Sequence, residues 1–418
     1  MSDAEATQKE EWPVRLEVKH KFGLEAKQMK KLLAVMIFAC GFLCQAQVNN
    51  LTQVDVVSLR KAAEQGDPKA QTALGVGHMT GEYGVEESYT EAIKWFRKAA
   101  QKGQADAQYF LGFCYAKGVG VKQSYAEAVK WYHKAAEQGS VKAQKDLGGL
   151  YFGGLGVERQ LNEAMKWYRK AAEQGDAEAQ CMLGSLYATF YEMDGKSEKE
   201  MVKWFRNAAE QGHANAQWLL GCFYENGVGA VVEKSDVEAW KWFRKAAEQG
   251  DVNAQKKLGD YYFDGRGVEE SYAEAVKWYR KAAEQGDVDA QSKLGLCYDK
   301  GHGVKPSYVE AEKWYREAAK SYRKSAWEGD AKAQLYLGNC YLSGQGVEQS
   351  YEKAVIWWRK AAEQGDVNAQ ARLGASYYMG QGVEKSVVEA RKWFRKAAEQ
   401  GDERAKKFLE LTEEDATK

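Results

Sequence analysis

The chain has 418 residues, of which 60 are Lys or Arg and 60 are Asp or Glu. This balance leaves no overall basic field to draw the protein to nucleic acid or to an anionic membrane surface, so neither is expected as a partner. Only 3 prolines are present and none lies inside a recurring helix pattern, so long uninterrupted helices are permitted.

The N-terminal region carries the pattern of an export signal. Residues 1–28 are polar, without repeat character, and are expected to be a non-native or disordered extension. Met29–Lys31 precedes an apolar run, Leu32–Leu43, which is too short to span a bilayer comfortably. A signal peptide over residues 29–46, with Met29 as the true start and cleavage after Ala46, predicts a periplasmic or secreted protein. A lipoprotein modified at Cys40 is the alternative.

A motif of eleven residues recurs along the rest of the chain. KWYRKAAEQGD occupies Lys166–Asp176 and returns at Lys277–Asp287. Five of the nine intervals between the closing glycines are 36 residues, two are 37, one is 38 and one is 43. These glycines are Gly66, Gly103, Gly139, Gly175, Gly212, Gly250, Gly286, Gly329, Gly365 and Gly401. The period predicts a solenoid of stacked helical hairpins over residues 54–412, followed by a disordered tail at 413–418.

Each repeat contains two predicted helices. In the unit from 104 to 139, Ala107, Leu111 and Tyr115 fall on one face of a first helix, which the glycines of Lys117–Val121 end. Ser124 and Glu127 form an S-x-x-E capping box that starts the second helix. The closing glycine ends that helix, and the Asp that often follows it can cap the next unit's first helix.

The second helix carries an apolar stripe made of Ala128, Tyr132 and Ala135, which Trp131 broadens toward a neighbouring unit. The recurring tryptophans, from Trp95 to Trp393, fit core packing, because aromatic side chains at a fixed helical spacing normally fill a core. The alternative is an aromatic ladder that binds a ligand.

These patterns resemble the Sel-one-like repeat (SLR) family. The resemblance rests on AQYFLGFCYAKGVGV at Ala107–Val121, SYAEAVKWYHKAAEQG at Ser124–Gly139 and their copies. It implies an all-α fold: a right-handed α/α superhelical solenoid, related to tetratricopeptide repeats, of about nine 36-residue helix-turn-helix repeats with a half repeat at each end. Members are mostly adaptor and binding proteins, so the chain is expected to be an exported scaffold for a protein or peptide partner, and to be monomeric.

Two repeats depart from the common repeat sequence. Ala188–Glu200 replaces one glycine loop, and seven extra residues around Lys320–Ala326 lengthen one second helix. Seven residues are about two helical turns, so the insertion keeps the apolar face in register. It forms either a docking ledge or a tolerated lengthening without a partner.

Signals for an enzyme, a metal or a cofactor are weak. No H-E-x-x-H occurs. Of the seven cysteines, Cys40 and Cys44 fall in the expected signal peptide, and the other five, in five different repeats, make a poor disulfide framework. Some secreted members of the family are described as β-lactamases, and S-x-x-K occurs at Ser321–Lys324 and Ser350–Lys353. Because S-D-N and K-T-G are missing, a β-lactamase-like hydrolase is only the alternative function. No catalytic residue, metal or cofactor is expected.

The relationship to tetratricopeptide repeats also implies a binding groove. Its concave surface is lined by first-helix positions two before and two after the Leu of each Leu-Gly pair, and these positions differ from unit to unit in this chain. Aromatic residues are enriched at binding hot spots, so the exposed aromatics expected here favour a groove; the alternative is that the positions are ordinary solvated ones. The groove residues are Tyr109, Phe113, Lys145, Trp218, Lys256, Asp260, Leu335 and Asn339.

Overall fold

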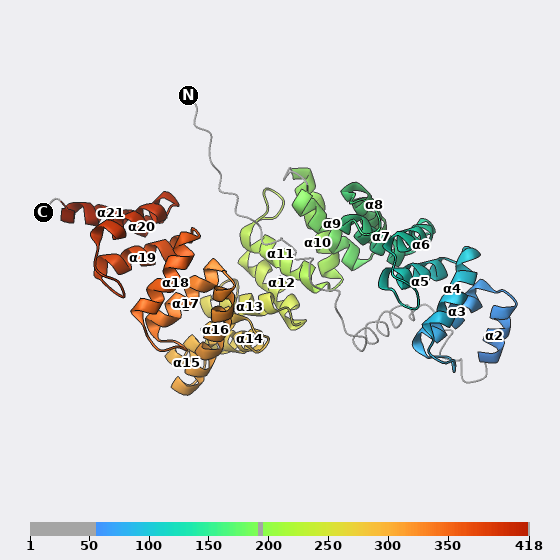
Figure 1. Ribbon diagram of the computed structural model, residues 1–418, viewed down its shortest axis with the longest axis horizontal. Helices are drawn as coiled ribbons and strands as arrows, with labels where there is room; N and C mark the ends of the chain where they lie inside the picture. Colours follow the sequence, from blue (N-terminus) through green and yellow to red (C-terminus); the bar gives the residue numbers. More distant parts are fainter. Residues whose placement is uncertain (1–55, 191–194, 417–418) are drawn as a thin grey trace, which may run out of the picture. The chain divides into compact units, whose positions relative to one another are not determined.

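The computed structural model describes residues 56–190 and 195–416 (Figure 1). The chain divides into two compact units. Unit 1 comprises the described residues up to Ala216 together with 229–231, and unit 2 comprises 217–228 and 232 onwards. Twenty helices form the described part of the chain, which contains no strand, only an isolated bridge between Val228 and Val232. The expected extension, signal peptide, Ala46 cleavage site and Cys40 all lie outside the described residues.

The helices alternate as the repeat predicts. Unit 1 contains α2 (Val56–Glu64), α3 (Pro68–Thr80), α4 (Tyr89–Gln101), α5 (Ala105–Lys117), α6 (Tyr125–Glu137), α7 (Val141–Gly153), α8 (Leu161–Glu173), α9 (Ala177–Phe190) and α10 (Gly195–Glu210). The next helix, α11 (Ala214–Asn226), spans the boundary between the units. Unit 2 continues with α12 (Asp236–Glu248), α13 (Val252–Asp264), α14 (Tyr272–Glu284), α15 (Val288–Lys300), α16 (Tyr308–Trp327), α17 (Ala331–Ser343), α18 (Tyr351–Glu363), α19 (Val367–Met379), α20 (Val387–Glu399) and α21 (Glu403–Ala416).

This order confirms the predicted all-α solenoid. Odd-numbered helices from α3 to α19 are the first helices of nine repeats, even-numbered helices from α4 to α20 are the second helices, and α2 and α21 are the half repeats. Within each unit, helices that follow one another along the chain pack together. The right-handed superhelix stays a prediction.

Side-chain caps set the helix starts as predicted. The Ser124 hydroxyl accepts the Glu127 backbone N–H at 3.3 Å, which is the serine half of the capping box. The Glu127 carboxylate pairs instead with Lys130 at 2.6 Å. At the start of the first helix α13, the Asp251 side chain accepts the backbone N–H of Ala254 at 2.8 Å. These local bonds fix the helix ends that the sequence predicts.

The second glycine of each G-x-G loop has a packing role as well as a turning role. Gly303 adopts φ +70°, and a Cβ there would overlap the backbone carbonyl of Tyr272, the first residue of α14. The loop after α15 therefore lies against the N-terminus of the second helix in the preceding repeat. Only a residue without a side chain permits this approach.

Most tryptophans of the second helices join successive repeats. Trp167 of α8 is buried in one cluster with Ala135 and Ala136 of α6. Trp278 of α14 packs in the same way against Ala246 and Ala247 of α12. These contacts confirm core packing for both tryptophans, in place of the ligand ladder.

A ladder of glutamine side chains also links the repeats, and the sequence analysis missed it. Gln334 of α17 donates its Nε2 to the Ala326 carbonyl, and its Oε1 accepts a bond of 2.8 Å from Gln364, after α18. Equivalent Gln–Gln bonds of 2.7–2.9 Å occur at six other places. After α16, Glu328 occupies the position that the donor Gln364 has after α18. A Glu cannot donate this bond, and the buried Oε1 of Gln291, its expected acceptor on α15, has no partner among the described residues.

We expect Glu328→Gln to raise the free energy of unfolding by about 1 kcal/mol, because it supplies the missing donor to Gln291. Urea denaturation of the variant and of the parent measures the difference. The matched control, Gln364→Glu, removes the equivalent donor to Gln334 and should lower stability by a similar amount. A loss of stability in Glu328→Gln would contradict this account.

Helix α16 is a single helix of 20 residues, where the other second helices of unit 2 have 13. This confirms that the insertion lengthens the helix without rotating its apolar face, because Tyr315 and Tyr322, seven residues apart, are both buried. The loop glycine of the next repeat, Gly346, lies against Tyr315 instead of the first turn. Tyr308 is therefore left 84% exposed. The exposed aromatics of α16 lie at its two ends, not around Tyr322.

Two helix boundaries differ from those expected from the sequence. In the repeat that lacks the glycine loop, α9 runs through Phe190 and α10 begins at Gly195, so only residues 191–194 of the altered segment lie outside the described structure. The expected tail from residue 413 is wrong in its start, because α21 continues to Ala416. Phe408 of α21 stacks on Phe394 at 4.9 Å, and no Gly or Pro follows to end the helix.

Candidate functional site

In unit 1, two predicted groove residues are not exposed. Tyr109 and Phe113 of α5 are buried. The ring of Tyr109 lies 5.6 Å from that of Tyr132 on α6, and its hydroxyl donates to the Asp146 carboxylate on α7. The expectation of exposed aromatics is wrong here, because these rings are long enough to fill the space against the neighbouring helices. The prediction that both residues bind a partner was based on their exposure, and they are not exposed.

Lys145, the third predicted residue of unit 1, joins two repeats. It is half-buried, and its Nζ lies 2.6 Å from Glu178 Oε2 and 3.5 Å from Asp176 Oδ2, both at the start of α9. Burial lowers the pKa of Lys145, but these carboxylates outweigh that effect and hold the pKa above its usual value. The ammonium group is therefore charged and already paired within the chain.

Asp146, beside Lys145, is a site residue that the sequence did not reveal. The hydroxyls of Tyr109 and Tyr132 both donate to its carboxylate. Burial raises the pKa of Asp146 from 3.8 to about 6, against the opposing effect of Lys145. A carboxylate in this position costs stability when it ionises.

We expect Asp146→Asn to raise the free energy of unfolding by up to about 2 kcal/mol at pH 7.5 and to have little effect at pH 4. Between pH 4 and 6 the folded state keeps a proton that the unfolded state has lost, so stability falls as pH rises through this window. Thermal melts of both proteins at the two pH values measure the effect. Equal gains at both pH values would show that ionisation of Asp146 is not the cause.

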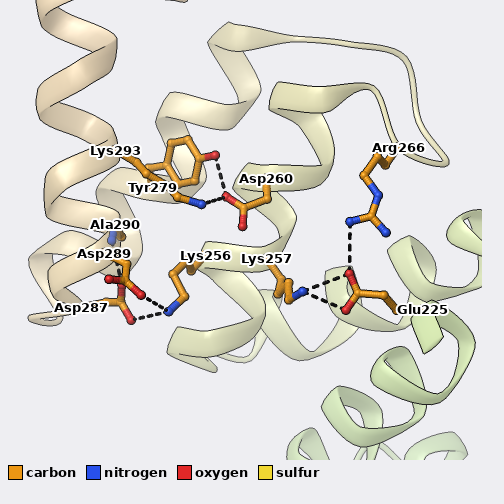
Figure 2. Close-up of polar contacts among 10 residues, drawn as sticks. All are labelled: Glu225, Lys256, Lys257, Asp260, Arg266, Tyr279, Asp287, Asp289, Ala290 and Lys293. Atoms are coloured by element: carbon orange, nitrogen blue, oxygen red, sulfur yellow. Dashed lines mark hydrogen bonds and ion pairs between the residues drawn. The ribbon is translucent and has the colours of Figure 1, made fainter. Parts of the chain in front are cut away.

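In unit 2, Lys256 of α13 makes the same kind of bridge. Its Nζ lies 3.2 Å from Asp287 Oδ2 and 3.2 Å from Asp289 Oδ2 at the start of α15 (Figure 2). Asp289 also accepts a bond of 3.1 Å from the Tyr322 hydroxyl of α16. Burial raises the pKa of Asp289, but Lys256 more than offsets this effect, and the net pKa lies below the usual value. Three helices therefore meet at one charged cluster.

Asp260, also on α13, lies in a second cluster. Its carboxylate accepts the Tyr279 hydroxyl at 2.7 Å and pairs with Lys293 of α15 (Figure 2). A third cluster lies on the side of Lys257, where Glu225 pairs with Lys257 at 2.8 Å and with Arg266 at 3.2 Å. Charges of both signs thus lie side by side along these helices.

The remaining predicted residues differ in exposure. Trp218 is half-buried, with its ring 5.0 Å from that of Phe243. Leu335 is buried, and Asn339 accepts a bond of 3.1 Å from the indole of Trp358. Leu335 is therefore a core residue, and its predicted place in an open groove is wrong.

One apolar side chain was missed although the sequence rule could have found it. Leu296 lies two residues after Leu294, in the register of Asp260, and is 38% exposed. We call Lys256, Asp260, Asp289, Lys293 and Leu296 the α13–α15 face. It combines half-exposed charges of both signs with an exposed aliphatic side chain, which suits contact with a peptide or protein.

The described residues give little support to other sites. They contain no cluster of three or more His, Cys, Asp or Glu side chains that could bind a metal, and no helix among them is both long and apolar enough to cross a bilayer. Ser350 of one S-x-x-K sequence caps α18 by accepting the backbone N–H of Lys353 at 3.2 Å. Its hydroxyl donates to Glu352 at 2.9 Å.

Stacked helical hairpins that present varied polar side chains along their first helices define a repeat scaffold. The chain belongs to the Sel1 repeat family, whose scaffolds generally mediate protein–protein interactions. The Sel1 repeat model matches residues 68–104, 105–140, 141–176, 177–213, 214–251, 252–287, 288–321, 331–366 and 367–402.

Solved structures agree with this membership. The chain is similar to c5321, a protective antigen present in uropathogenic Escherichia coli strains, with 34% identity, coverage of 87% of this chain and 91% of that one, and a TM-score of 0.51. It is also similar to a Sel1 repeat protein from Oxalobacter formigenes, with 32% identity over 91% of this chain and 92% of that one, at a TM-score of 0.36. No curated protein sequence matches significantly.

Proposed function

We propose that this protein is an exported scaffold that binds a protein or peptide partner through the α13–α15 face. The observation that carries the proposal is the contrast between repeated and varied positions. The caps, the glutamine ladder and the tryptophan contacts recur from repeat to repeat, whereas Lys256, Asp260 and Leu296 occupy positions that vary among the first helices. A uniform framework that carries different side chains in each repeat can recognise an extended, specific partner.

The charged side chains of this face favour a partner of mixed charge. Lys256 and Asp289 are half-buried, so their ion pairs keep part of their strength while one side remains open to solvent. Charged groups of a partner can add to these pairs and fix its register. Leu296, on the same helix as Asp289, supplies an exposed apolar contact.

Export is supported by the Met29–Ala46 pattern and by the similarity to a protein described as a protective antigen of uropathogenic bacteria. In a bacterial host with an intact export pathway, N-terminal sequencing should give a mature chain that begins at Gln47. A chain that retains residue 1 and stays in the cytoplasm would remove this part of the proposal.

The binding test compares two double variants in capture from an envelope extract, with quantitative mass spectrometry. Lys256→Ala with Asp260→Ala alters the α13–α15 face, and should lose at least about tenfold of the captured partner. Glu274→Ala with Lys277→Ala removes an exposed ion pair of α14 at 2.5 Å and serves as the matched control. Circular dichroism melts establish that both fold. Equal capture by the two variants would place the interface elsewhere.

The hydrolase alternative rests only on the two S-x-x-K sequences. Ser350 of one of them is engaged as a helix cap, because its hydroxyl accepts the backbone N–H of Lys353.

A further inference from the structure

We propose that a second surface, on the second helices α16 and α18, binds an acidic protein segment that carries an apolar anchor side chain. We call this surface the α16–α18 patch and define it by Lys324, Trp327, Lys353, Ile356 and Lys360. It is distinct from the α13–α15 face, which lies on first helices, and it does not rest on the proposed function.

The patch includes three exposed positions whose residue types differ from those in the other repeats. Of the nine second helices, eight carry a Glu three residues before a Lys, and α18 alone has Lys353 and Ile356 there. The eight regular pairs all form i,i+3 ion pairs. Trp327 stands where seven other repeats and the N-terminal half repeat have Glu and one repeat has Gln. All three departures fall in two successive second helices.

Contacts bring these departures together. The Trp327 ring lies 5.3 Å from the ring of Trp357 at 87°, an edge-to-face arrangement. Lys360 Nζ lies 5.0 Å from the centre of the Trp327 ring and 4.5 Å from that of Trp357. Ile356 lies one turn before Lys360, on the same side of α18. The three substituted positions and Lys360 therefore form one continuous surface.

The apolar groups of this surface are exposed yet held in place. Trp327 is 70% exposed and Ile356 is 54% exposed. Single exposed apolar side chains are ordinary, but here two lie together and both replace charged residues. Because Trp357 and Lys360 already hold the indole of Trp327, a partner orders it at little entropic cost, as is typical of a binding hot spot.

The charge of the patch selects the partner. Relative to the other repeats, the substitutions remove carboxylates at 327 and 353, remove an ammonium at 356 and add one at 353, a net change of two positive charges. Lys324 adds an exposed ammonium. In seven other second helices the equivalent Lys covers a Trp of its own helix, as Lys281 covers Trp278 at 3.9 Å. In α16, Ser321 replaces that Trp. Glu328 and Glu363 adjoin the patch in sequence and oppose this effect in part. The net gain of two positive charges still favours a partner whose carboxylates lie close to its apolar anchor.

The test restores the chemistry of the other repeats. The triple variant Trp327→Glu, Lys353→Glu, Ile356→Lys places in each position the residue that the other repeats carry, so it should fold like the parent. Phage-displayed random 16-residue peptides are selected on the full chain, and the enriched peptides are synthesised for fluorescence anisotropy. Lys277→Glu on α14, with the same net charge change of two, is the matched control.

We expect the enriched peptides to combine Asp or Glu with a Leu, Phe or Trp, to bind the control as tightly as the parent, and to bind the triple variant at least about tenfold more weakly. Binding that survives the triple variant would overturn the proposal, as would enrichment of basic peptides or of none. So would patch-dependent binding to phosphatidylserine vesicles, or dimers that the triple variant abolishes, since these outcomes assign the surface to a membrane or to a second copy of the chain.

Discussion

Truncation of Tyr279 to Ala is expected to lower the free energy of unfolding by about 3–5 kcal/mol. The ring is buried between α13 and α14, and a Cβ on Gly259 would overlap it, so the helices cannot close the cavity easily. Its hydroxyl also donates to Asp260 at 2.7 Å, and that carboxylate keeps only Lys293 when the hydroxyl is removed. Trp278→Ala should cost a similar amount by uncoupling α14 from α12.

Because coupling in a solenoid is local, the loss should appear first as partial unfolding of unit 2. Hydrogen exchange followed by mass spectrometry locates it, and denaturant titration gives its size. Lys277→Ala, which truncates an exposed neighbour, is the control and should be nearly neutral. A melt unchanged by Tyr279→Ala would show that this ring does not hold the hairpin together.

Replacement of Gly303 by Ala is expected to cost about 3 kcal/mol, the second largest effect. Alanine at φ +70° is strained, and its Cβ would overlap the backbone of Tyr272. Because backbone cannot move aside as a flexible side chain can, the loop must lift from α14.

The matched control is Gly286→Ala. Gly286 also has a positive φ, +93°, but a Cβ there meets nothing within 4 Å, so only the backbone strain of about 1 kcal/mol remains. Thermal melts of the two variants separate close approach from strain. Equal destabilisation would show that packing of the G-x-G loop against the preceding repeat contributes nothing.

Features that depend on residues close in sequence were predictable. Ser124 and Asp251 bond backbone groups only three residues away, so the helix starts follow from local pattern alone. The effect of the seven-residue insertion was also predictable, because two full turns keep the apolar face of α16 in register. The periodicity fixed the order of the helices.

The contacts between repeats were not predictable in the same way. Whether Tyr109 is exposed depends on how closely α7 approaches α5, and no local pattern encodes that distance. The pairing of Lys256 with Asp287 and Asp289 depends on the offset between α13 and α15. Periodicity nevertheless contained two unused signals: the first-helix glutamine of the ladder recurs in every repeat, and Trp327 and Ile356 stand out only when the repeats are aligned on each other.

The most direct test of the proposed scaffold function is photo-crosslinking in living cells. A benzophenone side chain at Leu296, on the α13–α15 face, is compared with one at Lys277, on the exposed side of α14. A discrete crosslinked product at Leu296 that is missing at Lys277 and disappears in the Lys256→Ala, Asp260→Ala background is the predicted result. Identical products at both positions, or none at Leu296, would contradict binding of a partner at this face.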